Sequence, residues 1–202
     1  MSVPVIVFAK APVPGEVKTR LIPALGAAGA AALHERLVDR TLATAVEAAV
    51  GPVELCCTPD DPHPALAALA RVHGATLAAQ GPGDLGERMR AAFARVLAAA
   101  PAAVLIGADC PPLTAQHLRD GAAAVAGDAD AVVAPAEDGG YVLIGLKRAV
   151  DSLFAGVGWG GPTVMAETRV RLAAAGLRWR ELATLWDIDR PEDLVRLPKE
   201  RD

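Results

Sequence analysis

The first loop of the chain gathers three positive charges, in the segment FAKAPVPGEVKTRL at residues 8–21. Lys10, Lys18 and Arg20 stand there with a single acid, Glu16, although the protein carries a formal net charge of −4. Two prolines and a glycine limit the freedom of the loop, and Lys and Arg side chains readily bind phosphate oxygens. The loop is therefore either a phosphate-binding segment or an ordinary solvated surface. It contains neither a Walker A nor a GxGxxG pattern.

Carboxylates that could hold a metal ion occur in two segments. Asp109 follows the apolar run AAVLIG at residues 102–107, where a carboxylate is costly unless it is exposed, paired or metal-bound. It is either a turn residue or a ligand of Mg²⁺, which takes one or two carboxylates together with substrate phosphates. In the segment WDIDRPEDL, Asp187 and Asp189 point the same way if the chain is extended. We favour Asp189 as the second ligand and keep Asp187 as the alternative.

Two glycine-containing segments could lie against a flat ligand. QGPGDLGERM at residues 80–89 places three glycines around Gln80 and Asp84. Glycine lets the backbone approach a ligand closely, so Gln80 could bind the edge of a base. The alternative is a plain loop that enters a helix capped by Asp84. EDGGYVLIG at residues 137–145 contains Asp-Gly, which is typical of a hairpin turn.

Short apolar runs that alternate with longer Ala- and Leu-rich segments must position these residues. The expected strands are residues 3–8, 52–57, 102–107, 130–135 and 141–146. The expected helices are residues 27–49, 64–73, 85–99, 115–126 and 163–175. This alternation predicts an α/β fold with a mostly parallel sheet and helices on both faces. Ligands of such sheets bind beyond the carboxyl ends of the strands, so we expect the turn-rich segments described above to converge there.

Composition excludes several classes of protein. The 202 residues suit a single domain over residues 1–202, and the slightly acidic charge argues against a general nucleic-acid binder. Three cysteines, two of them adjacent, form neither a disulfide framework nor a zinc site. The four histidines lack ligand spacing, and we interpret them as surface or satisfied residues; Cys110 is interpreted as a packing residue. No signal peptide or membrane helix is evident, and a cytoplasmic location is expected.

The motifs resemble those of a bacterial family over roughly residues 3 to 197. FAKAPVPGEVKTRL, GDLGERM, GADCPPLT, EDGGYVLIGL and DIDRPEDL occur in the order seen in the radical-SAM/selenium-domain-associated transferase family 1. That family is often described as a glycosyltransferase of arsenosugar pathways, and it resembles the GT-A superfamily of nucleotide-diphospho-sugar transferases. Its relatives include guanylyltransferases that make molybdenum-cofactor dinucleotides and phospholactate-guanosine intermediates. The resemblance therefore implies a single-domain GT-A fold.

The resemblance also implies roles for particular residues. Phosphates would be bound by Lys10, Lys18 and Arg20. The base side of the nucleotide site would comprise Gln80, Gly81, Leu85 and Gly86. The acceptor side would comprise Gly139, Gly140 and Tyr141. Asp109 and Asp189 would hold Mg²⁺ or Mn²⁺.

One departure from sugar transferases directs the functional hypothesis. Such enzymes usually carry Asp-x-Asp at the metal strand, whereas Cys110 and Pro111 follow Asp109 here. A lone Asp with a basic first loop is closer to nucleotidyltransferases, in which an acceptor phosphate attacks an NTP and pyrophosphate leaves. Lys18, Arg20 and Asp109 would then be the catalytic residues. The alternatives are a glycosyltransferase that uses an NDP-sugar and, third, a nucleotide-binding module without turnover.

Overall fold

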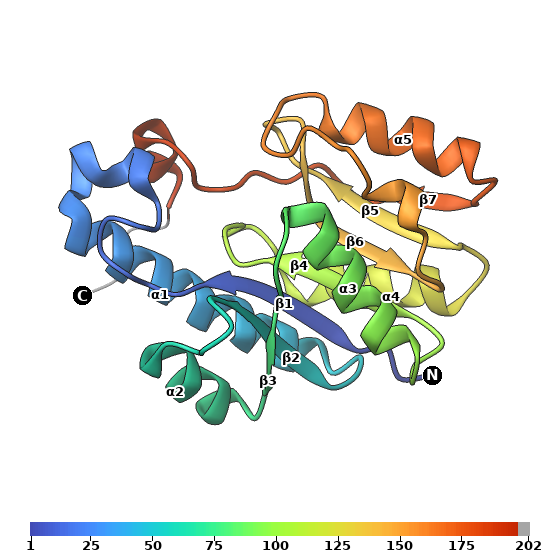
Figure 1. Cartoon of the computed structure of the whole chain (residues 1–202), viewed down its shortest axis with the longest axis horizontal. Helices are drawn as coiled ribbons and strands as arrows, with labels where there is room; N and C mark the ends of the chain where they lie inside the picture. Colours follow the sequence, from blue (N-terminus) through green and yellow to red (C-terminus); the bar gives the residue numbers. More distant parts are fainter. Residues whose placement is uncertain (198–202) are drawn as a thin grey trace.

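The computed structural model describes residues 1–197, which form a seven-stranded sheet with helices on both faces (Figure 1). The strands are β1 Val5–Lys10, β2 Val53–Thr58, β3 Thr76–Ala79, β4 Ala103–Gly107, β5 Ala131–Pro135, β6 Tyr141–Leu146 and β7 Trp179–Glu181. Across the sheet their order is β3-β2-β1-β4-β6-β5-β7. Strand β6 runs antiparallel to β4 and β5, and the other paired strands are parallel. The prediction of a mostly parallel sheet is therefore confirmed.

Five α-helices and three short 3₁₀ helices complete the described chain. They are α1 Ile22–Ala48, α2 Pro64–His73, α3 Leu85–Leu97, α4 Ala115–Ala126, α5 Val164–Ala174, η1 Thr19–Leu21, η2 Asp151–Leu153 and η3 Pro191–Arg196. Side chains of α1, α2 and α4 share one apolar cluster with the sheet, and those of α3 and α5 share another. Since the two clusters use alternate residues of the same strands, they lie on opposite faces of the sheet. The expected helices on both faces are confirmed.

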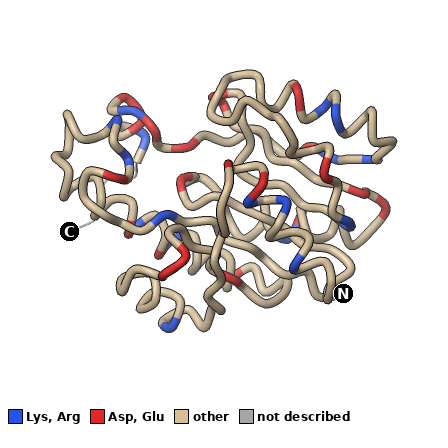
Figure 2. The backbone as a smooth tube through the Cα atoms, viewed as in Figure 1, with Lys and Arg blue, Asp and Glu red and all other residues tan. Residues whose placement is uncertain are grey.

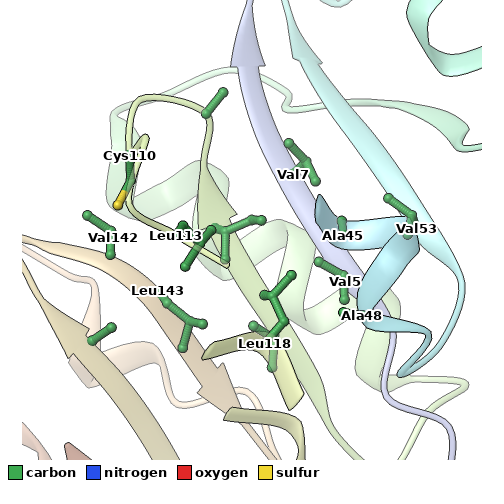
Figure 3. Packing of buried hydrophobic residues seen from close by; sticks show 14 of the residues in the cluster. Val5, Val7, Ala45, Ala48, Val53, Cys110, Leu113, Leu118, Val142 and Leu143 are labelled. Atoms are coloured by element: carbon green, nitrogen blue, oxygen red, sulfur yellow. The ribbon is translucent and has the colours of Figure 1, made fainter. Parts of the chain in front are cut away.

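Small side chains allow the helices to pack close to the sheet. In Figure 3, Ala45 and Ala48 of α1 lie beside Val5 and Val7 of β1 and Val53 of β2. All five side chains are buried. With aromatic residues making up only 3% of the sequence, this core is built from Ala, Val and Leu, as the composition requires.

The sequence-based prediction missed β3 and β7, which are the two edge strands of the sheet. Strand β3 is mostly exposed, and β7 is three residues long with two exposed polar residues, so neither has the continuous apolar pattern of a buried strand. Helix α1 begins at Ile22 rather than at residue 27. Gly26, with φ of 70°, interrupts its helical dihedral angles, so the regular helix starts close to the expected position.

The carboxyl ends of β1 to β5 all lie at one edge of the sheet, because these strands run in the same direction. The segments that follow them include the basic first loop, the glycine-rich segment before α3, the Asp109 loop and the β5–β6 turn. Residues 182–190 then leave β7 at this same edge and run toward the start of α1 (Figure 1). The expected convergence of the turn-rich segments is confirmed.

Candidate active site

Lys18 is the cation of the first loop that reaches into the sheet edge. The residue has a left-handed backbone, with φ of 48°, and its side chain is only 7% exposed. Its Nζ lies 2.9 Å from Oδ2 of Asp109 and donates a hydrogen bond of 2.5 Å to the carbonyl oxygen of Ile188. The structure therefore brings together three segments that are far apart in the sequence: the first loop, the β4 loop and residues 182–190.

Lys10 and Arg20 lie farther out. Lys10 ends β1, is exposed, and donates from Nζ to the carbonyl oxygen of Glu16 at 2.9 Å. Arg20 is exposed and forms an ion pair with Asp189. Basic and acidic segments lie side by side where the first loop meets the C-terminal segment (Figure 2). Lys10 and Arg20 are exposed and can meet an anionic ligand from solvent, whereas the side chain of Lys18 is buried against Asp109.

Asp109 is held in its ionised form. Burial opposes ionisation, but the charges of Lys18 and His34 outweigh it and lower the pKa of Asp109 to about 2. The side chain as a whole is 44% exposed, while its Oδ1 atom is buried and has no hydrogen-bond partner among residues 1–197. One edge of the carboxylate is thus enclosed by protein, and the exposed remainder can meet a ligand.

His34 is a site residue that the sequence analysis missed. It lies on the buried face of α1, and its Nε2 is 2.9 Å from the carbonyl oxygen of Lys10. Its Nδ1 is 3.6 Å from Oδ1 of Asp109. The other histidines match the interpretation as satisfied residues: His63 caps α2, His73 pairs with Asp39, and His117 bonds to the start of α4.

Ile188 fixes residues 182–190 across the site. It is fully buried against Leu21, Leu33 and Leu37, and its N–H donates to the carbonyl oxygen of Asp109 at 2.9 Å. In extended chain its two neighbours point away from this apolar contact. Asp187 and Asp189 flank this buried contact, so Ile188 holds the segment that carries both carboxylates at the sheet edge.

The two aspartates of this segment nevertheless have different surroundings. Asp187 lines a cavity at the sheet edge, where burial, followed by the nearby charge of Asp138, raises its pKa to about 6. The charge of Asp109 also contributes to this shift. Asp189 lines an outer groove, which Asp187 also borders, and is paired with Arg20. Asp187 thus lies within electrostatic reach of Asp109, while Asp189 already has a cationic partner.

The cavity has a volume of about 220 Å³ and apolar walls. Its lining is Phe8, Leu85, Met89, Leu105, Gly107, Ala136, Asp138, Gly140, Tyr141, Val142, Trp159, Gly160, Gly161, Val164 and Asp187. The rings of Tyr141 and Trp159 meet edge to face, with centroids 6.3 Å apart. Burial raises the pKa of Tyr141, so its phenol stays neutral. Within residues 1–197, the charged members of this lining are two aspartates and no Lys or Arg.

Glycines shape the turn between β5 and β6. Gly139 has φ of 92°, and a Cβ there would overlap the carbonyl oxygen of Pro162, so its role is to allow this close approach. The N–H of Gly140 donates to Oδ1 of Asp138 at 2.8 Å. Of the three residues expected on the acceptor side, Gly140 and Tyr141 line the cavity, whereas Gly139 lies close to the backbone of Pro162.

Two residues of the segment expected on the base side already form hydrogen bonds within the protein. Nε2 of Gln80 donates to the carbonyl oxygens of Ala9 and Cys56, at 3.2 and 2.9 Å, which leaves its oxygen as the remaining polar group. The N–H of Gly81 donates to Asp60 at 3.0 Å. Leu85 is 44% exposed and lines the cavity.

The glycine and acid beside this segment have structural roles. A Cβ on Gly86 would lie 2.7 Å from Nε1 of Trp159, so this glycine allows the indole to pack against α3. Asp84 forms a capping box with Glu87, which confirms the helix-capping alternative for Asp84. Cys110, beside Asp109, is buried in the apolar cluster with Leu113 and Val142 and contributes packing (Figure 3).

The carboxylates present suit a hard divalent cation. Among residues 1–197, no group of three or more His, Cys, Asp or Glu is arranged to hold a metal ion, which does not favour a zinc-type site. The charge of Asp109 disfavours ionisation of Asp187, and a cation beside both carboxylates would relieve that repulsion. Two carboxylates that share a cation with substrate phosphates are the usual ligand set of Mg²⁺. The donor set therefore fits the expected metal.

None of the helices in residues 1–197 is both long and apolar enough to span a bilayer.

Solved structures support the expected fold. A protein from Desulfovibrio desulfuricans G20, provisionally described as a nucleotide-diphospho-sugar transferase, is 29% identical with a TM-score of 0.87 over 100% of this chain and 90% of that one. CMP:2-keto-3-deoxy-manno-octonic acid synthetase, complexed with CTP, is 13% identical with a TM-score of 0.62, over 97% and 96% of the two chains. Glucosyl-3-phosphoglycerate synthase from Mycobacterium tuberculosis, with Mn²⁺, UDP and glucosyl-3-phosphoglycerate, is 12% identical with a TM-score of 0.57, over 96% and 75%.

The chain thus has the fold of nucleotide-diphospho-sugar transferases. No curated protein sequence matches it. A family model, described as "Uncharacterized protein conserved in bacteria (DUF2064)", matches residues 41–161, which is more than half of the chain. The chain therefore belongs to this bacterial family, DUF2064.

Proposed function

We propose that the protein is a metal-dependent nucleotidyltransferase, which transfers a nucleotidyl group from an NTP to a phosphorylated small molecule and releases pyrophosphate. The contact between Lys18 and Asp109 carries this proposal. It places a cation beside a metal-type carboxylate at the sheet edge where ligands of α/β folds bind. A triphosphate with its metal needs this combination, because positioning and charge neutralisation supply most of the catalysis of phosphoryl-type transfer.

Asp109 and Asp187 would hold Mg²⁺ or Mn²⁺, in place of the pair of Asp109 and Asp189 that the resemblance implied. Bound there, the ion would neutralise phosphate charge and orient the reacting oxygens. The glucosyl-3-phosphoglycerate synthase structure, with Mn²⁺ and UDP, supports a divalent cation in this fold. Asp189, which pairs with Arg20, would instead position the guanidinium.

The cations of the first loop would bind the phosphates at different depths. Lys18, whose Nζ contacts Asp109 and the carbonyl oxygen of Ile188, would bind the phosphate nearest the metal. Lys10 and Arg20, which are exposed, would bind the outer phosphates that leave as pyrophosphate. The glycine-rich segment at Gly81 and Leu85 would lie against the base.

The cavity would hold the acceptor, with Gly140 and Tyr141 among its walls. Because its charged lining groups are Asp138 and Asp187, it suits a body that is uncharged or cationic. The acceptor's own phosphate, as the nucleophile, would have to lie outside the cavity, toward Lys18 and the metal. A nucleophile that is already an anion needs no general base.

A second candidate, glycosyl transfer from an NDP-sugar, is favoured by the same acidic cavity. A sugar or an acceptor hydroxyl can donate hydrogen bonds to Asp138 or Asp187. The described lining contains no Lys or Arg, so it offers no cation that would favour an anionic ligand instead. The resemblance to the radical-SAM/selenium-domain-associated transferases, with their arsenosugar-type chemistry, points the same way.

Calorimetry with a panel of nucleotides at one fixed Mg²⁺ concentration separates the candidates. We expect an NTP to bind more tightly than the matching NDP-sugar, and pyrophosphate to compete with the NTP. Mass spectrometry of turnover should then show pyrophosphate and a nucleotide-linked product. A tighter NDP-sugar, with no effect of pyrophosphate, would establish glycosyl transfer, and tight binding without turnover of any donor would reject both.

A further inference from the structure

Two buried polar atoms, one on His34 and one on Asp109, lie close together next to the candidate metal site. Nδ1 of His34 and Oδ1 of Asp109 are 3.6 Å apart, and neither has a hydrogen-bond partner among the described residues. Buried polar groups are rarely left without partners, because each one costs about 1–3 kcal/mol. The pairing of two such atoms therefore points to an interaction between them.

The ring of His34 is held from its other side. Its Nε2 lies 2.9 Å from the carbonyl oxygen of Lys10, the last residue of β1. A carbonyl oxygen only accepts, so Nε2 carries a hydrogen and donates it. The side chain is also only 6% exposed, on the buried face of α1, so the ring has little freedom to turn. Nδ1 is consequently directed at Asp109.

We propose that His34 is a positioning residue that braces the carboxylate of Asp109 for metal binding; this rests on the proposed function. Nζ of Lys18 lies 2.9 Å from Oδ2, and Nδ1 of His34 lies 3.6 Å from Oδ1, so each oxygen has its own neighbour. The bond from Nε2 to Lys10 orients the ring so that a hydrogen on Nδ1 would be directed at Oδ1. These two contacts restrict rotation of the carboxylate and leave its exposed part free to meet the cation. Loss of such supporting contacts typically weakens metal binding by about 10- to 100-fold.

Two substitutions separate the two ends of the ring. The amide nitrogen of Asn can occupy the place of Nδ1, so His34→Asn keeps a donor toward Asp109 and loses the bond to Lys10. The amide nitrogen of Gln can occupy the place of Nε2, so His34→Gln keeps the bond to Lys10 and loses the donor toward Asp109. Each variant is thus the matched control of the other.

The affinity for Mn²⁺ alone, measured from the electron paramagnetic resonance signal of the free ion, is the main readout. We expect His34→Gln to weaken Mn²⁺ binding by on the order of 10-fold and His34→Asn to stay within about twofold of wild type. Equal affinities in all three proteins overturn the proposal. So does a loss that is larger in the Asn variant, or one that follows the melting temperatures of the variants, because each would indicate a purely structural role.

A second measurement separates this inference from the proposed function. In metal-free protein labelled with ¹⁵N-histidine, Asp109→Asn should shift the Nδ1 resonance of His34 and leave that of His63 unchanged. An unchanged Nδ1 resonance removes the contact and overturns the inference, whatever the protein catalyses. A wild-type protein that binds no Mn²⁺ overturns the metal-dependent function and the bracing role with it, even if the resonance shifts.

Discussion

Replacing Lys18 with Met tests the centre of the proposed phosphate site. Met keeps most of the length of the side chain and removes the charge, and the left-handed backbone at this position treats the two residues alike. The change deletes the contact with Asp109 at 2.9 Å and the hydrogen bond to Ile188. It also removes the cation that would meet the phosphate nearest the metal.

The expected magnitude follows from the kind of contact that is lost. A hydrogen bond to a charged group contributes about 1.5–3 kcal/mol, which corresponds to a loss of roughly 10- to 150-fold in NTP affinity. The matching nucleoside, which lacks phosphates, should bind within about twofold of wild type. Breaking a fully buried ion pair costs roughly 3–5 kcal/mol of stability. The cost here should be smaller, because the side chain of Asp109 is 44% exposed and water can solvate it.

Calorimetric titrations with the NTP and with the nucleoside, at one fixed Mg²⁺ concentration, measure the two affinities, and the melting temperature reports the change in stability. Arg20→Met is the matched control, because its ion pair with Asp189 is exposed and such pairs contribute about 0–1 kcal/mol to stability. That variant should melt close to wild type and lose less NTP affinity than the Lys18 variant. Equal losses for NTP and nucleoside in the Lys18 variant would show that the residue only holds residues 182–190 in place, and would refute the phosphate role.

Three further expectations concern the metal, the thiols and the β5–β6 turn. Asp187→Asn should weaken Mn²⁺ binding by at least about 10-fold, whereas Asp189→Asn should have little effect; the reverse ranking would restore Asp189 as the ligand. Because burial raises the pKa of Cys56 to about 12 and encloses the other two thiols as well, Ellman's reagent at pH 8 should label no thiol in the native protein and three in denaturant. Gly139→Ala should lower the melting temperature more than Gly156→Ala. Both glycines have a positive φ, but a Cβ at residue 139 would overlap a backbone carbonyl, whereas one at residue 156 would meet open space. Equal losses would show that backbone strain alone, and not the close approach to Pro162, explains the need for Gly139.

The buried part of the fold could be predicted because burial leaves a pattern in the sequence. Strands β1, β2, β4 and β5 are covered on both faces, and their continuous apolar runs place them within a residue or two. Strand β3 is held at the edge of the sheet by main-chain pairing with β2, and its side chains are mostly exposed. Main-chain hydrogen bonds do not depend on residue type, so such a strand carries no periodic signal.

The site was predictable where local chemistry decides, and unpredictable where the fold decides. Asp109 could be singled out because a carboxylate directly after a buried strand needs a partner. The identity of that partner could not be read, because Lys18 and Asp109 meet only once β1 and β4 are neighbours in the sheet. The choice between Asp187 and Asp189 likewise depended on the cavity and on the pairing of Asp189 with Arg20.

His34 shows which signal in the sequence was available and not used. Its neighbours on α1, among them Leu33, Leu37 and Val38, form the buried face of the helix, and His34 interrupts that apolar stripe. A polar side chain on a buried face must find hydrogen-bond partners, and an imidazole can bind two at once. The helix packs beside β1, so those partners had to come from the ends of the central strands. The absence of metal-ligand spacing around His34 therefore excluded only the role of a direct metal ligand. Its place on a buried helical face also indicates a second possible role, that of a residue which orients the carboxylate of Asp109.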